Sequence, residues 1–555
     1  MGKYIPDVCF HTFNHQGYGV HFFYPYFLND PAALLWHLTG RPVTAVLLFN
    51  AAIHWIGLAI AYDTYLTWQG KPLPAFIFAI LYIFGVSGFN INLLKLTMYN
   101  QYMAFIWLPW VMMGISQLIC GNHQKWMKRA VLGVTLLTLT HVLTLFFCMV
   151  YAAVLFLSAL MRRQITRARV ICWVKAILIL IPATAIFTFP MLEQRMANAW
   201  LKVPAQNLKY RHQLSYSLRD GSGLFTKWNG ALNFSNILFL LLIIVVILLI
   251  YDHLLDRTLF KCAIGMGTIL VLQSHLIPWN VLDHLALIDM IQMLWRLDGL
   301  FYLFAAFAIA YGFQKLWAAK SPSLGPKPFI IMTAALYLVF ASQNFYPVKD
   351  ILHRAHAGNP AGRTQTVTPV TLSDALSHPS FSENEKLERV YLVNGFYDYR
   401  AKGQVVGDQT RGILHAGDFQ IENHRSLYPN PHAPADQKIQ TNLLIENAIL
   451  IDGKRALHHF SQRGQAFYIR KLPKGSHMIQ TPITYLRGFK AFDENGKVLR
   501  VQKNATGFLA IPSKGTGRIK ITYEKTTLHK IAIGLSMLTW VMVASTFLFR
   551  KKATP

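Results

Sequence analysis

The chain has 555 residues, of which 53% are hydrophobic and only 14% are charged. A soluble chain carries about a quarter charged residues, so long apolar segments must account for the difference, and this excludes a soluble enzyme. The formal net charge of +28 then fits basic residues collected at cytoplasmic helix ends better than a nucleic-acid-binding surface.

Apolar runs of roughly 20 residues mark helices that cross a bilayer core about 30 Å thick. The sequence predicts a polytopic α-helical membrane protein with about eleven such spans, two of them separated by a break near His141. The segment from Phe22 to Leu38 is too short to cross, so we interpret it as a re-entrant or interfacial helix. The predicted spans are Val43–Thr67, Pro74–Phe89, Tyr102–Cys120, Ala130–Thr140, Val142–Leu160, Val170–Phe189, Asn236–Tyr251, Phe260–Gln273, Gly299–Trp317, Phe329–Phe345 and Ile531–Phe549.

Basic residues are concentrated in alternate short loops and in the C-terminal tail, which predicts that the tail lies in the cytoplasm. The same alternation places the N-terminal segment outside, although no signal peptide or helix precedes it, so we expect the gene product to be longer or truncated. The predicted domains are an extracytoplasmic or interfacial segment (1–42), a multi-span membrane domain (43–346) with an outer loop (193–233), an extracytoplasmic β-rich domain (347–527), and a C-terminal transmembrane helix with a cytoplasmic basic tail (528–555).

The composition changes sharply after Pro347, where polar residues, glycines and prolines replace the apolar runs. Short alternating segments there predict strands, and Asn495-Gly496 predicts a tight turn between two of them. These strands are predicted to form a small β-sandwich. They are predicted at Leu387–Val393, Gly412–Ile421, Thr441–Ile451, Ala466–Arg470, Ile483–Phe492, Lys497–Val501, Gly507–Ile511 and Gly517–Tyr523.

Several short motifs spread over nearly the whole chain resemble one bacterial family. They are Gly17-Tyr18-Gly19-Val20, Phe22-Phe23-Tyr24-Pro25, Ala104 with Leu108-Pro109, His141, Pro190 at a helix exit, Ser274-His275-Leu276-Ile277-Pro278-Trp279, Ile291-Gln292 with Trp295-Arg296, and the run Tyr485–Tyr523. This set resembles the YfhO-type membrane proteins and the related 6-pyruvoyl-tetrahydropterin-synthase-related membrane proteins. Those families are similar to the GT-C class of glycosyltransferases, which use polyprenyl-phosphate sugars.

The resemblance implies an extracytoplasmic carboxylate that acts as base and cationic groups that hold the departing phosphate. The carboxylates considered are Asp7, Asp30, Glu193, Asp283, Asp289 and Asp298. We predict catalytic roles for Asp7, His141 and Asp298. Asp7 could instead be a solvated loop aspartate, and His141 could be a hydrogen-bonded histidine that packs helices.

Arg296 is predicted to bind the donor phosphate, because a planar guanidinium fork suits phosphate oxygens. Alternatively, Arg296 is an interfacial residue paired with Asp289 or Asp298. Basic and aromatic residues of the outer loop could bind an anionic polymer or lipid head groups. Alternatively, they form an amphipathic segment that lies on the bilayer surface. The other predicted substrate-binding residues are Tyr24, Gln101, His275, Trp279, Lys209 and Arg211. Ligand spacing typical of a metal site is not found, and none is predicted.

The first functional hypothesis is a membrane glycosyltransferase with the lipid bilayer, a lipid-linked sugar and a cell-envelope polymer or lipid as partners. The second is a non-catalytic relative whose β-domain binds envelope glycans or proteins. Asn100-Gln101 favours the second, because such relatives often have Gly-Glu there and this chain lacks that carboxylate. A lipid-linked sugar transporter is a third hypothesis, although duplicated halves are not evident.

Overall fold

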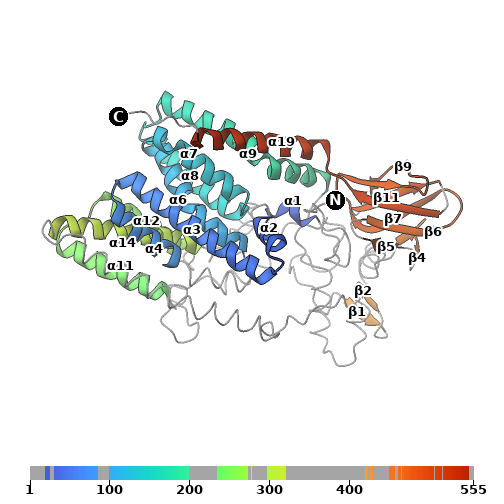
Figure 1. Ribbon diagram of the computed structural model, residues 1–555, viewed down its shortest axis with the longest axis horizontal. Coiled ribbons are helices and arrows are strands. Elements are labelled where there is room, and N and C mark those ends of the chain that lie inside the picture. The colour runs from blue at the N-terminus through green and yellow to red at the C-terminus, as the bar shows by residue number, and fades with distance from the viewer. Residues whose placement is uncertain are drawn as a thin grey trace.

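The computed structural model describes residues 19–25, 30–85, 99–198, 234–272, 277, 297–320, 419–422, 426–429, 449–456, 460–463, 466–504, 507–514 and 517–548. Figure 1 shows a bundle of long helices at one end of the molecule and a compact β-domain at the other. Helices α9 (Arg167–Ala197) and α19 (Thr527–Leu548) run side by side from the bundle to the β-domain.

Five of the described helices are long and apolar enough to cross a membrane, namely the apolar parts of α6, α8, α9, α14 and α19. The protein is therefore helix-rich with several candidate membrane spans, and the larger number of about eleven stays a prediction. The predicted span Phe329–Phe345 and the predicted strand Leu387–Val393 lie outside the described residues. Besides α9 and α19, the described helices are α1 (Val20–Phe23), α2 (Asp30–Thr39), α3 (Pro42–Gln69), α4 (Pro72–Gly85), α6 (Tyr99–Cys120), α7 (His123–Thr138), α8 (Val142–Met161), α11 (Phe234–Tyr251), α12 (Arg257–Leu272) and α14 (Asp298–Lys320).

Large apolar side chains point outward on the helices at the surface of the bundle. Val154 of α8, Leu178 of α9 and Val541 of α19 are each 60% exposed or more. Water would solvate such a surface poorly, whereas lipid chains solvate it well. By contrast, α6 and α14 are mostly buried and form the centre of the bundle.

The predicted break near His141 is present. Helix α7 ends at Thr138 and α8 begins at Val142, with a turn between them. The side chain of His141 caps α8, since its Nδ1 accepts the backbone N–H of Thr144. One continuous apolar run therefore forms two helices, because a polar cap starts the second helix.

Helix α9 differs from the prediction, which ended it near Phe189 with Pro190 at the exit. It continues through both Pro182 and Pro190 to Ala197, so the first residues of the predicted outer loop (193–233) are helical. Prolines are tolerated inside a membrane helix where neighbouring groups compensate for the lost backbone hydrogen bond. Helix α9 packs along α19, which lies more than 300 residues away in sequence and bonds to backbone groups of the turn from Pro182 to Ile186.

Ser536 of α19 inserts its hydroxyl into the backbone ladder of α9. Its Oγ donates to the carbonyl of Pro182 at 2.8 Å and accepts the N–H of Ile186 at 2.9 Å, two groups that would otherwise bond to each other. One turn further along α19, Trp540 Nε1 donates to the carbonyl of Ala183 at 2.9 Å. These bonds fix the register of α19 against α9.

We expect Ser536→Ala to lower the stability of the protein by about 0.5–1.5 kcal/mol, because it removes two hydrogen bonds between α19 and α9, of which the α9 groups can recover one by bonding to each other. Ser545→Ala is the matched control, since the bond that Ser545 makes among the described residues lies within its own helix, to the carbonyl of Met542. Thermal unfolding of both variants in the same detergent measures the difference. Equal melting temperatures for the two variants would show that the inserted hydroxyl contributes nothing.

The β-domain consists mainly of two five-stranded sheets with orders β10-β11-β7-β3-β4 and β5-β6-β12-β8-β9, and both sheets contribute to one hydrophobic core. Ile479 and Ile511 of the first sheet and Ile469 and Ile521 of the second are fully buried in it. The strands are β1 (Phe419–Glu422), β2 (Ser426–Pro429), β3 (Ile449–Ile451), β4 (Lys454–Ala456), β5 (Phe460–Arg463), β6 (Ala466–Leu472), β7 (His477–Thr484), β8 (Phe489–Phe492), β9 (Val498–Leu499), β10 (Gln502–Lys503), β11 (Phe508–Ser513) and β12 (Gly517–Tyr523).

The predicted single strand Ile483–Phe492 is wrong, because a turn separates β7 from β8. Gly488 in that turn has φ +117°, and a Cβ there would collide with the carbonyl of Glu524. Only glycine adopts this conformation at so close a backbone approach. The predicted turn at Asn495-Gly496 is confirmed between β8 and β9, with Gly496 at φ +79°.

Asp452 and His477 form an ion pair at the surface of the β-domain, with 2.5 Å between Oδ2 and Nδ1. His477 donates from its other nitrogen to the carbonyl of Lys474, so both ring nitrogens are donors and the imidazole is protonated. The hydrogen bond to Asp452 raises the pKa of His477, and the hydrogen bond from His477 lowers the pKa of Asp452.

The pair should therefore stabilise the β-domain most between the ordinary pKa of Asp, 3.8, and that of His, 6.5. Its contribution is lost as pH rises through the raised pKa of His477, and is lost again as pH falls through the lowered pKa of Asp452. We expect His477→Gln to lower the melting temperature at pH 6 but not at pH 9. An equal loss at both pH values would contradict the ionic role.

Candidate functional site

The N-terminal strap, residues 19–25, connects the β-domain to the helix bundle. Phe22 is buried in the core of the β-domain, with its ring centroid 5.8 Å from that of Tyr523. Two residues later, the ring of Tyr24 meets the ring of His141 edge-on, with centroids 6.3 Å apart. The carbonyl of Pro25 accepts a hydrogen bond from the side chain of Asn100. The strap thus brings Tyr24, predicted to bind substrate, against His141, predicted to be catalytic.

A second connection joins the end of α9 to the turn between β7 and β8. The side-chain amide of Gln194 donates to the carbonyl of Arg487 at 2.8 Å and accepts the N–H of the same residue at 2.9 Å. Asn198 donates to the carbonyl of Tyr485 at 2.6 Å, and Lys503 donates to the carbonyl of Ala197 at 2.7 Å. The β-domain is therefore held on the bundle by directional bonds beside the strap.

His141 is 3% exposed and makes its hydrogen bonds through Nδ1, to the Oγ1 of Thr144 at 2.8 Å and to its backbone N–H. An Nδ1 that accepts an N–H carries no proton, so the neutral ring has its proton on Nε2. These bonds show His141 as a hydrogen-bonded cap of α8, and its catalytic role stays a prediction. A neutral imidazole that presents an Nε2–H could also donate a hydrogen bond to a substrate oxygen.

Gln101 lies on α6 at the same end of the bundle and is 1% exposed. Neither its Oε1 nor its Nε2 has a hydrogen-bond partner in the part of the chain that the structure describes. The next turn of α6 carries Phe105, against which Gly299 at the start of α14 packs so closely that a Cβ would collide with the ring. The backbone of Asp298 therefore lies near the α6 turn that holds Gln101, although its side chain is not described.

A buried amide with two unsatisfied atoms costs stability. We expect Gln101→Leu, of similar volume, to keep or raise the melting temperature, because it removes those atoms without opening a cavity. Gln314→Leu is the contrasting variant and should lower it, since Gln314 Oε1 accepts the hydroxyl of Tyr65 at 2.8 Å. A clear loss of stability in Gln101→Leu would show that the amide makes a structural bond after all.

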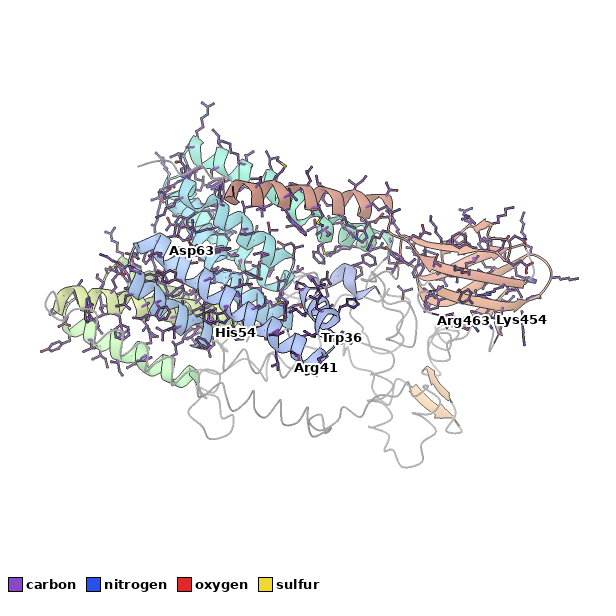
Figure 2. All side chains as sticks on the ribbon, viewed as in Figure 1. Trp36, Arg41, His54, Asp63, Lys454 and Arg463 are labelled. Atoms are coloured by element: carbon purple, nitrogen blue, oxygen red, sulfur yellow. The ribbon has the colours of Figure 1, made fainter. Side chains whose placement is uncertain are left out.

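Asp30 is a half-buried carboxylate at the start of α2, a helix too short to cross a bilayer. Burial raises its pKa to about 6. Figure 1 shows α2 at the end of the bundle nearest the β-domain, and Figure 2 places Trp36 and Arg41 there as well, with Asp63 at the opposite end. A carboxyl with a pKa this close to neutral can accept a proton from a hydroxyl and release it again.

The structure thus brings Tyr24 and His141 into contact and places Gln101 beside Asn100 at the same end of the bundle. Among the described residues, no group of three or more His, Cys, Asp or Glu side chains could hold a metal ion. The other predicted site residues lie outside the described residues, namely Asp7, Lys209, Arg211, His275, Trp279 and Arg296.

Sequence reasoning missed the role of Asn100 and a polar pair next to it. The hydroxyl of Tyr102 lies 2.6 Å from Nε2 of His54, which Figure 2 shows partway along α3. A polar residue in the middle of an apolar run, as at His54, is the signal that could have revealed this pair. The contact between Asn100 and Pro25 has no such signal, because 75 residues separate its partners.

A family model described as the Peptidase M61 N-terminal domain matches residues 432–539, which include most of the β-domain and the start of α19. The match covers about a fifth of the chain and none of Tyr24, Gln101 and His141. It shows a similarity of the β-domain and leaves the helix bundle unassigned. No curated protein and no solved structure matches the chain.

Proposed function

We propose that this chain is a GT-C-like membrane protein of the YfhO type that transfers a sugar from a polyprenyl-phosphate donor to a cell-envelope polymer or lipid. In this proposal about eleven spans cross the cell membrane, the β-domain is extracytoplasmic, and the C-terminus is cytoplasmic. One observation supports it most: the strap brings Tyr24 against His141 and beside Asn100, next to the buried amide of Gln101, which has no hydrogen-bond partner among the described residues.

The proposed reaction needs a base for the acceptor hydroxyl. Asp30 is the described carboxylate that suits this role best, since its pKa of about 6 leaves it ionised at neutral pH yet able to accept a proton. Asp7 and Asp298 remain alternative bases. The acceptor hydroxyl would attack the anomeric carbon of the donor sugar, the bond to the phosphate oxygen would break, and the proton would pass to the carboxylate.

The donor must also be held and its departing phosphate stabilised. The unpartnered amide of Gln101 can both donate to and accept from sugar hydroxyls, and the ring of Tyr24 offers a face for a sugar or for the lipid chain. The phosphate needs a cation, for which Arg296 stays our prediction, while Arg41 is an exposed cation at the same end of the bundle. A buried site would strengthen each of these contacts.

Membranes that contain the full chain should transfer radiolabel from a polyprenyl-phosphate sugar to polymer or lipid. We expect Asp30→Asn to reduce this rate about 100-fold or more, because it removes the base. The transfer rate of the unaltered protein should rise with pH through about 6, as Asp30 loses its proton. The residual transfer rate of Asp30→Asn should not rise over this pH range. Asp452→Asn, a change at the surface of the β-domain, is the control and should transfer normally.

A second candidate function is favoured by Gln101, which stands where a carboxylate would be expected of a catalytic relative. In this case the chain binds envelope glycans or partner proteins without transferring sugar. The same assay distinguishes the transferase from the non-catalytic protein. The non-catalytic protein would bind the labelled donor or the polymer but would form no labelled polymer or lipid. Transfer that is unaffected by Asp30→Asn would refute Asp30 as base, and absence of transfer in every membrane preparation would refute the transferase.

A further inference from the structure

An exposed arginine marks the end of the apolar surface of α9 that lies nearest the β-domain. Arg195 stands beside Leu192 and Met196, two large apolar side chains that are also exposed. The next cation along α9, toward its other end, is Lys175. At the rise of an α-helix, Lys175 and Arg195 are about 30 Å apart, which is the thickness of a bilayer core. Arg195 therefore lies at the level of the lipid head groups when the apolar surface of α9 is in the bilayer.

Helix α19 has the same arrangement at its start. Lys530 is exposed, and its neighbours Leu528 and Ile531 are large apolar side chains that are exposed as well. The exposed residues Met537 and Val541 follow on the same side of the helix, about two and three turns after Lys530. A lysine in such a position lays its aliphatic stem along the apolar surface, while its ammonium reaches the head groups.

The β-domain adds a third exposed cation at the same place. Arg487, in the turn between β7 and β8, bonds through its backbone to Gln194, and Arg195 is the next residue of α9. On the other side of Gln194, the carboxylate of Glu193 accepts the hydroxyl of Thr526 at 2.7 Å, directly before α19 begins. These bonds bring the end of α9, the start of α19 and the β7–β8 turn together, as Figure 1 also shows.

The charge at this junction is unbalanced. Three exposed cations, which we call the junction cations, form no ion pair with any described residue; they are Arg195, Arg487 and Lys530. Of the nearby carboxylates, Glu524 pairs with Lys490, with 2.7 Å between the charged atoms. The carboxylate of Glu193 is then the remaining negative charge of the described residues here, so a net positive charge is left. Cations at the edge of an apolar surface are stabilised when an anion lies within reach.

We propose that the junction cations bind the head-group phosphate of an anionic glycerophospholipid, whose acyl chains lie along the exposed apolar side chains of α9 and α19. A guanidinium forms charge-assisted hydrogen bonds with two phosphate oxygens, and an ammonium adds a point charge. An anionic head group fits better than a zwitterionic one, because the cations would repel its ammonium. This lipid would be a bound component of the folded protein and no substrate, so the inference does not rest on the proposed function.

The bound lipid would connect the same three elements that the hydrogen bonds of the junction connect, namely α9, α19 and the β7–β8 turn. A ligand that binds the folded protein and not the unfolded chain stabilises the fold. We therefore expect phosphatidylglycerol to raise the melting temperature of the detergent-solubilised protein more than phosphatidylcholine does. Because the site lies at the junction, the gain should disappear when the junction cations are removed.

The test uses the purified full chain in detergent, titrated with phosphatidylglycerol or with phosphatidylcholine of the same acyl chains. Native mass spectrometry measures the dissociation constant of the first bound lipid. We expect phosphatidylglycerol to bind about tenfold more tightly than phosphatidylcholine, and this ratio to fall below about threefold in Arg195→Gln with Lys530→Gln. The matched control is Lys454→Gln with Arg463→Gln, which removes two exposed cations that Figure 2 shows on the β-domain. The control should keep the ratio of the unaltered protein.

A second variant, Arg195→Lys with Lys530→Arg, keeps both charges and should keep the preference for phosphatidylglycerol. Its loss in this variant would assign the effect to altered structure and overturn the proposal. Equal loss in the two charge-removing variants would show a general effect of net charge and no site. The proposal is also wrong if the unaltered protein binds both lipids equally. Displacement of phosphatidylglycerol by an equal concentration of glycerol 1-phosphate would show a phosphate site to which the acyl chains contribute nothing.

Discussion

A reciprocal pair of hydrogen bonds between Gln194 and the backbone of Arg487 determines how the two halves of this protein meet. The pair forms only if α9 continues past Pro190 to its observed end at Ala197. Before it reaches Pro190, α9 packs along α19, whose Ser536 and Trp540 bond to the carbonyls of Pro182 and Ala183. The bundle, the C-terminal helix and the β-domain are therefore joined by hydrogen bonds from side chains to backbone groups at both junctions.

The strap, residues 19–25, also spans the junction between the β-domain and the bundle. Phe22 is anchored in the core of the β-domain, so the next residues have little freedom, and Tyr24 and Pro25 are held against the helix bundle. A site built on a rigid support keeps its side chains within the narrow limits that binding and catalysis need. Movement of the β-domain relative to the bundle would therefore be transmitted to the contact between Tyr24 and His141, which makes this junction part of the candidate site.

Hydropathy was enough to predict most helices of the bundle, since lipid-facing and buried helices both need long apolar runs. The break at His141 and the strand Gly517–Tyr523 were also predicted, because a polar cap and an alternating pattern are local signals. The end of α9 was not predicted, because a proline usually indicates a helix end and no local pattern shows that α9 packs along the distant helix α19. In the same way, Tyr24 and His141 could be singled out separately, but their contact depends on tertiary packing that no local pattern encodes.

Polar groups in an apolar bundle are informative when each is compared with its neighbours. Asn100, Tyr102 and His141 all make hydrogen bonds, as buried polar groups generally must. Gln101 stands between two of these residues and makes none within the described chain. An unsatisfied buried amide costs about 1–3 kcal/mol, and an apolar residue of the same size would avoid that cost. Such a residue, at the point where the strap, α6 and α14 converge, fits a site for a polar ligand, because a ligand could supply the hydrogen bonds that the described residues do not.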